Sequence, residues 1–198
     1  MAGLVQLHRS VLESSIGIVG HVTARDLERP TPCTGWTLRR LLAHMVGQNY
    51  GYAAAADGAV HDRVVFADRP VSDQPAEDYA ASARRVIEAF GAPSLIGGSI
   101  YLPEVRGGMT HSAPMAIGFN LLDCVAHGWD VAKSLDIAAE FDDDALQVAL
   151  KVAEAVPAEA QTIDDRTPFR PSVPTASTSM LDRVIATLGR SPGWTPPT

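Results

Sequence analysis

The fold is decided by a stretch in the second half of the sequence, LLDCVAHGWDVA, which runs from Leu121 to Ala132. Its leucines, valines and alanines recur at the spacing of a helix that packs into a core. Asp123 and His127 interrupt this apolar pattern. Because they are four residues apart, a helix places both on one face, one turn from each other. A carboxylate and an imidazole side by side on a packed helix raise the question of a polar site in the core.

The same helical spacing of apolar residues recurs along most of the chain and predicts its secondary structure. We expect helices at about residues 3–22, 37–56, 75–90, 112–135, 142–156 and 180–188, a strand at 99–102 and a short extended piece at 64–66. This pattern predicts a mainly α fold: a four-helix bundle with an extra helix beside it and an irregular C-terminal extension. Residues 1–156 would form the bundle, and residues 157–198 the extension packed on the same domain.

Composition and charge narrow the class of protein. A chain of 198 residues with 46% hydrophobic residues is long enough to bury one core. The net charge of −7 argues against a nucleic-acid partner, which would need a basic surface. No apolar run is long enough to span a bilayer, and the first twenty residues do not read as a signal peptide. The two cysteines form no disulfide framework, so the reducing cytoplasm is the expected compartment.

A polar stripe extends from the Asp123–His127 pair along the same helix face. Its members are Asn120, Asp123, His127, Asp130 and Ser134. Any amphipathic helix has a solvent-facing edge, and that is the simplest interpretation. The stripe contains no Lys, Arg or Glu, however, and a face that is only solvated usually carries them. An Asp-x-x-x-His pair on a helix in a bundle is therefore a candidate for two ligands of a metal ion.

A third ligand is best sought among the six histidines. His8, His21 and His61 lie at the ends of the first predicted helix or in a loop, and we expect them at the surface. His44 lies in mid-helix at the edge of an apolar stripe, where it is either a ligand or a histidine hydrogen-bonded to a neighbour. His44, Asp123 and His127 would form an open site with N and O ligands, suited to zinc first and also to nickel, iron or manganese.

Two segments resemble a known family: PCTGWTLRRLLAHMVG, Pro32 to Gly47, and the stretch LLDCVAHGWDVA. They are similar to the DinB-like superfamily, in particular its branch around mycothiol-dependent maleylpyruvate isomerase. The tail, with Phe169 to Pro174 and LDRVIATLGRSPGW, Leu181 to Trp194, resembles actinobacterial metal-binding members of that branch. The resemblance implies a four-helix bundle that holds a divalent metal, usually zinc. Its ligand motifs fall on His44, Asp123 and His127.

The resemblance also implies a low-molecular-weight thiol as cofactor: mycothiol, bacillithiol or glutathione. The metal would bind this thiol as a thiolate. Polar side chains near the predicted pocket mouth, Gln48, Asn120 and Asp130, are the expected cofactor-binding residues, and Asn120 or Asp130 would alternatively orient a metal ligand. The chain departs from the isomerase in carrying Asp123 where that enzyme has Glu, and in having only about forty residues after Val156.

Four functions fit these patterns. The first is a metal- and thiol-dependent transferase or isomerase that acts on a small electrophile. The second is a metal- or thiol-binding module without turnover. The third is a metal-dependent hydrolase, for which Asp130 is the one obvious acid or base. The last is a bundle without metal in which Asp123 and His127 simply pair. The expected partners are the thiol and its substrate, without nucleic acid or membrane; a homodimer stays open.

Overall fold

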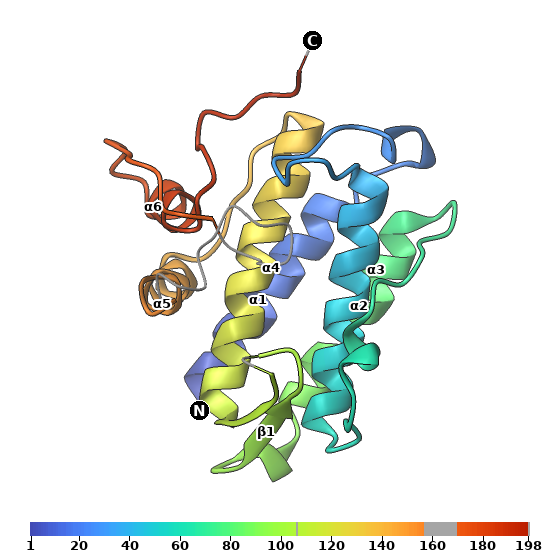
Figure 1. The fold of residues 1–198 in the computed structure, drawn as a ribbon, viewed down its shortest axis with the longest axis vertical. Helices are drawn as coiled ribbons and strands as arrows, with labels where there is room; N and C mark the ends of the chain where they lie inside the picture. The colour runs from blue at the N-terminus through green and yellow to red at the C-terminus, as the bar shows by residue number, and fades with distance from the viewer. Residues whose placement is uncertain (106, 157–169, 198) are drawn as a thin grey trace.

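The computed structural model describes residues 1–105, 107–156 and 170–197, and within them the protein is mainly helical (Figure 1). The long helices are α1 (Ala2–Val19), α2 (Leu38–Ala56), α3 (Pro75–Phe90) and α4 (Ala113–Leu135). Two shorter helices follow, α5 (Asp143–Glu154) and α6 (Met180–Thr187). Strand β1 (Ser99–Leu102) pairs antiparallel with β2 (Met109–Ser112). The connections contain the short 3-10 helices η1 (Ala24–Asp26), η2 (Arg63–Phe66) and η3 (Pro93–Leu95).

The four long helices form the bundle. Helix α2 packs against α3 and α4, and α1 packs against α3 and α4, while α5 lies beside α4 and α6 packs on α5 (Figure 1). The β1–β2 hairpin closes one end of the bundle, where it contacts α2 and α4. The predicted mainly α fold, with four long helices and a fifth beside them, is confirmed.

The core is built from the apolar stripes that predicted the helices. Each long helix contributes residues with almost no exposed surface, such as Leu12, Leu41, Val86, Ile117 and Leu121. Removing apolar surface from water contributes roughly 25 cal/mol per Å², so these facing stripes provide the main driving force for assembly. Helix α4 has apolar neighbours on most of its surface, which explains why its polar residues stand out in the sequence.

Two local predictions met different outcomes. The strand at residues 99–102 is confirmed, but its partner at Met109–Ser112 was not predicted. The extended piece predicted at 64–66 is wrong, because this segment is the 3-10 helix η2. The Asp62 side chain accepts a hydrogen bond from the Val64 N–H at 3.1 Å, which caps the turn, and Phe66 is buried against α2.

The C-terminal part returns to the bundle. The predicted extension begins with residues 157–169, which lie outside the described residues. From residue 170 the chain leads to α6 and then to Gly189, whose φ of +78° is a conformation that favours glycine. An added Cβ at Gly189 would also meet Arg170 at 2.6 Å. This turn directs the next residue, Arg190, toward α4.

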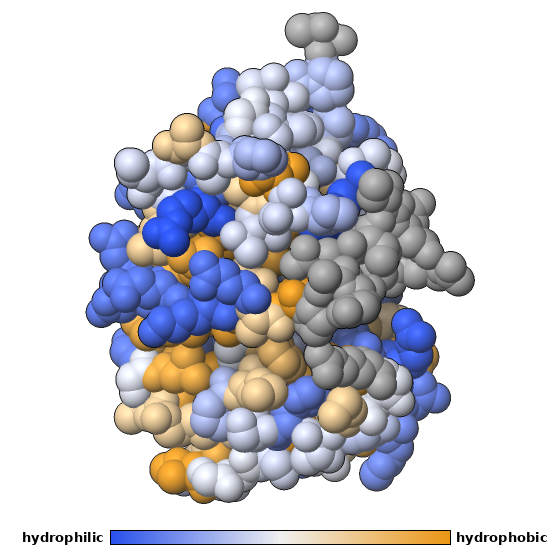
Figure 2. Space-filling view, turned by 60° about the vertical axis from the view of Figure 1, so that its left-hand side comes forward, coloured by the Kyte–Doolittle hydropathy of each residue, from blue (hydrophilic) through white to orange (hydrophobic). Residues whose placement is uncertain are grey.

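A helix that spans a membrane has to be long and predominantly apolar. Among the helices in the described part of the chain, none is long and apolar enough to cross a membrane. On the face shown in Figure 2, hydrophilic side chains alternate with smaller apolar patches.

Candidate metal centre

The polar stripe of α4 lies inside the protein rather than on a solvent-exposed face. Asn120, Asp130 and Ser134 are fully buried, His127 is nearly so, and Asp123 is partly exposed. The composition of the stripe had argued against a solvated face, and burial agrees with that argument. Buried polar side chains need partners, because an unpaired one costs roughly 1 to 3 kcal/mol. The partners of each member therefore show what the stripe does.

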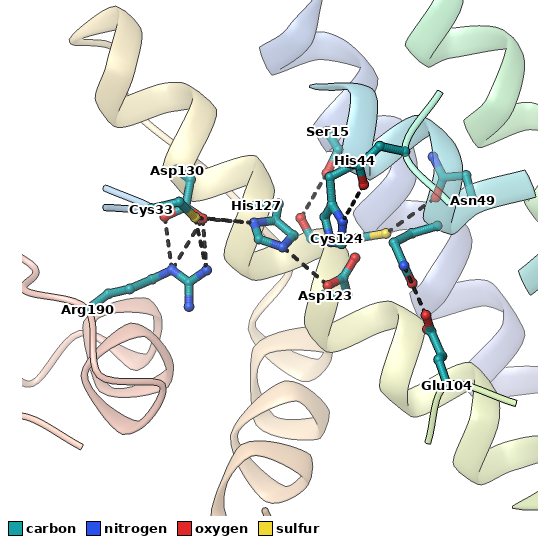
Figure 3. Close-up of polar contacts among 12 residues, drawn as sticks. Ser15, Cys33, His44, Asn49, Glu104, Asp123, Cys124, His127, Asp130 and Arg190 are labelled. Carbon is teal, nitrogen blue, oxygen red and sulfur yellow. Dashed lines mark hydrogen bonds and ion pairs between the residues drawn. The ribbon is translucent and has the colours of Figure 1, made fainter. Parts of the chain in front are cut away.

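His44, Asp123 and His127 converge between α2 and α4 (Figure 3). The His127 Nε2 atom lies 3.3 Å from Asp123 Oδ1, as expected for residues one helical turn apart. The His44 ring faces the His127 ring edge-on, with 5.2 Å between the ring centroids. One donor atom from each of the three residues lies within 4.8 Å of the other two. Two imidazoles and one carboxylate at this spacing form a suitable donor set for a borderline divalent metal such as zinc.

A carboxylate stands behind each imidazole. His127 Nδ1–H donates to Asp130 Oδ2 at 2.9 Å, and His44 Nδ1–H donates to Asp68 Oδ1 at 3.3 Å. Because Nδ1 of each ring is engaged by a carboxylate, Nε2 is the nitrogen left to bind a metal. Metal-binding histidines almost always have such a partner, which fixes the tautomer and the ring orientation.

Asp68 is brought to His44 by close packing of its loop on α2. A Cβ at Gly47 would lie 2.3 Å from the Ala67 carbonyl oxygen, and one at Gly51 would lie 2.3 Å from the Phe66 ring. The Arg69 N–H also donates to the Ala43 carbonyl at 2.9 Å. The two glycines of α2 are therefore required for the loop to approach, and the loop carries Asp68 onto His44.

Asp130 is held by Arg190, which arrives from the C-terminal part of the chain. Arg190 Nε donates to Asp130 Oδ1 at 3.0 Å, and Arg190 Nη2 donates to Oδ2 at 3.0 Å, a bidentate contact (Figure 3). Burial raises the pKa of Asp130, but the Arg190 charge and the His127 hydrogen bond outweigh it and lower the pKa to about 2. Asp130 is thus ionised at neutral pH and serves to orient His127.

The same neighbours act on His127. Burial lowers its pKa, but the Asp123 charge and the hydrogen bonds to Asp123 and Asp130 outweigh burial, so the pKa is raised well above 6.5. In the protein without metal, His127 consequently carries a proton that a metal ion would have to displace. Metal binding at this site therefore releases protons and weakens as the pH falls.

A second group of possible ligands overlaps the first. Cys33, His127 and Asp130 also present donor atoms within 4.8 Å of one another. Cys33 Sγ donates to Asp130 Oδ2 at 3.2 Å, and Arg190 Nη2 lies 3.5 Å from the same sulfur. Because a guanidinium cation already neutralises this group, a metal ion there would face a like charge. Within the described residues neither His44 nor Asp123 forms an ion pair with an Arg or Lys, so the first group is the better metal centre.

Comparison with known proteins agrees with this architecture. Residues 8–132 match the family described as the mycothiol maleylpyruvate isomerase N-terminal domain. The chain belongs to this family. Both helical motifs that carried the resemblance lie within the matched residues, so that resemblance is confirmed.

Relatives and solved structures with a similar sequence or fold are also known. Two uncharacterized proteins of Mycobacterium tuberculosis, from two strains, are each 27% identical over 151 residues, or 75% of this chain and 76% of theirs. Two crystal structures of the mycothiol-dependent maleylpyruvate isomerase, one of a histidine-to-alanine mutant, share the fold. Their TM-scores are 0.57 and 0.59 at 16% and 14% identity, and the match covers 81% of this chain and 69% of theirs.

The three residues predicted to bind a cofactor, Gln48, Asn120 and Asp130, lie in three different environments. Gln48 is buried one turn beyond His44, and its Nε2 donates to Glu104 Oε2 at 3.2 Å. Asp130 contacts His127 but is closed off by Arg190. Asn120 is not brought to the group, because it is fully buried and accepts a hydrogen bond from His8 Nε2 at 2.7 Å.

The expectation that His8 is a surface residue is wrong. Its side chain is fully buried between α1 and α4, with the Phe90 ring 4.8 Å from its own. Burial lowers the pKa of His8 to about 4, so it is neutral at physiological pH. His8 and Asn120 thus form a neutral pair away from the candidate metal centre.

Sequence reasoning did not identify four residues that shape the centre: Cys33, Asp68, Glu104 and Arg190. Asp68 and Glu104 lie in connections, where no helical period reveals which side chains face inward. Cys33 and Arg190 lie in segments that carried the family resemblance, Pro32 to Gly47 and Leu181 to Trp194. That resemblance was the available signal for these two residues. Only the folded chain brings them to the helices.

Proposed function

We propose that this protein binds one divalent metal ion, zinc by preference, through His44, Asp123 and His127. With that ion it would activate mycothiol, or another low-molecular-weight thiol, for attack on a small electrophile. The reaction would be a thiol-dependent transfer or isomerisation. The observation that carries this proposal is the convergence of three donor atoms within 4.8 Å from two helices, with a carboxylate behind each imidazole.

The donor set supports a metal that is open to a further ligand. Three protein donors leave room in a tetrahedral shell for one atom of a cofactor or substrate. When bound, the metal would supply a positive charge that stabilises a thiolate at neutral pH. Mycothiol is the first thiol to test because the family is described by mycothiol maleylpyruvate isomerase.

The protein's own residues would prepare the centre for that ligand. Asp68 and Asp130 hold the protons on Nδ1 of His44 and His127, so that both Nε2 atoms face inward as donors. Arg190 keeps Asp130 ionised and in place. Asp123 lies one turn from His127 and adds a negative charge, which favours binding of a cation.

The first experiment is metal analysis of protein purified without added metal, followed by zinc titration. One zinc per chain in the wild type, and loss of it in His44→Ala, would support the proposal. Thiol consumption with a panel of small electrophiles then tests for turnover. A wild-type protein that retains no metal from a zinc-containing buffer would contradict the proposal.

Two other functions share the ligand set. The first is metal-dependent hydrolysis, for which Asp130 would have to act as acid or base. The low pKa of Asp130, about 2, and its ion pair with Arg190 disfavour that role. A metal- or thiol-binding module without turnover is the remaining alternative, and thiol consumption separates it from the enzyme.

The composition of the chain leads us to propose its cellular compartment and its partners. Cys33 and Cys124 are both free thiols, which fits the reducing cytoplasm. The net charge of −7 leads us to expect no nucleic-acid partner. The proposed partners are a small thiol and its electrophilic substrate, and gel filtration would test whether the protein is a homodimer.

A further inference from the structure

Glu104 is a partly buried carboxyl group that has no role in the function proposed above. It lies in the connection between β1 and β2, just after Leu102, which is fully buried. The Val105 N–H donates to the Leu102 carbonyl at 3.3 Å and so holds the turn that carries Glu104. The hairpin contacts α2 and α4, and the turn brings Glu104 to the end of the candidate centre (Figure 3).

The contact between Gln48 and Glu104 locates the carboxyl relative to the metal ligands. Gln48 is four residues after His44 on α2, so the two side chains lie on one face about 5 to 6 Å apart. The Gln48 Nε2 atom donates to Glu104 Oε2 at 3.2 Å. Glu104 is therefore held next to Gln48, on the side of the centre that the hairpin covers.

We propose that Glu104 takes up the proton that a thiol loses when it binds at this centre. The S–H bond would break with its electron pair left on sulfur, and the proton would pass to Glu104 Oε1, converting the carboxylate to a carboxylic acid. This proposal rests on the proposed function, because it concerns the thiol of that reaction. It supplies the base that the ligand set by itself lacks.

The surroundings of Glu104 suit such an exchange. Its pKa is raised to about 7: burial is the largest cause, the Asp123 charge adds to the rise, and the Gln48 hydrogen bond, His44 and Arg63 oppose it. These groups face Glu104 from α4, α2 and η2, the elements around it. A carboxyl with a pKa near neutrality can both accept and return a proton under physiological conditions.

Calorimetric titration of the zinc-loaded protein with mycothiol would test the proposal. Titrations in two buffers of different ionisation enthalpy give the number of protons released to the solvent. At about pH 8 we expect the wild type to release fewer protons than Glu104→Gln, because the negative charge of the bound thiolate would raise the Glu104 pKa further, so that Glu104 retains part of the thiol proton. At about pH 6 Glu104 is already protonated, so the two proteins should release similar numbers.

Glu88→Gln on the exposed face of α3 is the matched control and should release the wild-type number of protons. Zinc content and thermal unfolding, measured on each variant, would show that the fold and the centre are intact. Equal proton release by wild type and Glu104→Gln at both pH values, with thiol bound, would overturn the role of Glu104 and leave the proposed function standing. Failure of the zinc-loaded wild type to bind mycothiol would instead overturn the proposed function, and this proposal with it.

Discussion

Two buried histidines, His8 of α1 and His127 of α4, have neighbours that give them opposite properties. His8 of α1 accompanies Asn120, a neutral amide, and burial lowers its pKa to about 4. His127 lies between the carboxylates of Asp123 and Asp130, and its pKa is raised well above the usual value although burial opposes this. Both side chains are almost inaccessible to solvent. The difference therefore lies in the charges of the partners, and it separates a neutral packing residue from a candidate ligand.

The largest expected effect is on metal binding by His127. His127→Ala should weaken zinc binding by several orders of magnitude, because a three-ligand site loses one donor. His61→Ala, at an exposed position, should retain the wild-type affinity. Competition with a zinc-binding dye would measure both. The assignment of His127 fails if the two variants bind zinc equally well.

The next effect concerns stability as a function of pH. His8 has a folded-state pKa of about 4 against 6.5 in the unfolded chain, so the unfolded state binds protons first as the pH falls. Its contribution is fully present above pH 6.5 and is lost as the pH falls toward 4, up to about 3 kcal/mol. Urea denaturation of the wild type and of the double variant His8→Leu, Asn120→Leu would measure this, and the variant should lose that pH dependence.

His127 should show the opposite trend in protein without metal. Its folded-state pKa is raised, so its contribution to stability is present below pH 6.5 and is lost as the pH rises through the folded value. Urea denaturation of His127→Gln between neutral and alkaline pH should lack this loss. If His8 and His127 variants changed the pH dependence in the same direction, the contrast between the two histidines would be wrong.

A smaller effect is expected from the carboxylate behind His127. Asp130→Asn keeps the size of the side chain but removes the charge, so zinc affinity should fall about 10- to 100-fold. Arg190 would lose its partner in that variant, and Asp130→Asn combined with Arg190→Met separates the two effects. Dye competition would report the affinities. Unchanged affinity in the single variant would show that Asp130 does not orient a ligand.

The smallest effect is expected from Asp68, the carboxylate behind His44. Asp68 is half exposed, and its hydrogen bond to His44 is longer, at 3.3 Å. Asp68→Asn should therefore lower zinc affinity by less than about tenfold. Asp73→Asn, an exposed acidic residue in the same region, is the matched control. An effect of Asp68→Asn larger than that of Asp130→Asn would reverse the order expected from burial.

Much of the fold was predictable because its helices carry continuous apolar stripes. Helix α4 was placed within a residue of its observed limits, and the stripe of α2 predicted that His44 lies at the edge of the core. Helical spacing predicted that Asp123 and His127 share a face, and the family resemblance added support for His44, which the structure brings beside them. That these residues bind a metal stays a prediction.

What lay in the connections could not be predicted in the same way. Glu104 and Asp68 reach the centre because a hairpin and a close-packed loop fold onto the bundle, and such contacts have no sequence period. The burial of His8 could not be predicted, because its partner Asn120 lies on α4, far away in the sequence. Long-range pairs such as His8 with Asn120 become visible only when the helices are assembled.

The most direct test of the central claim is zinc X-ray absorption spectroscopy on the zinc-loaded protein without thiol. We predict nitrogen and oxygen ligands at about 2.0 to 2.2 Å, including two imidazoles, from His44 and His127 with Asp123. Zinc held instead by Cys33, His127 and Asp130 would add a sulfur ligand at about 2.3 Å and leave a single imidazole. That spectrum, or no stoichiometric zinc to measure, would contradict the account.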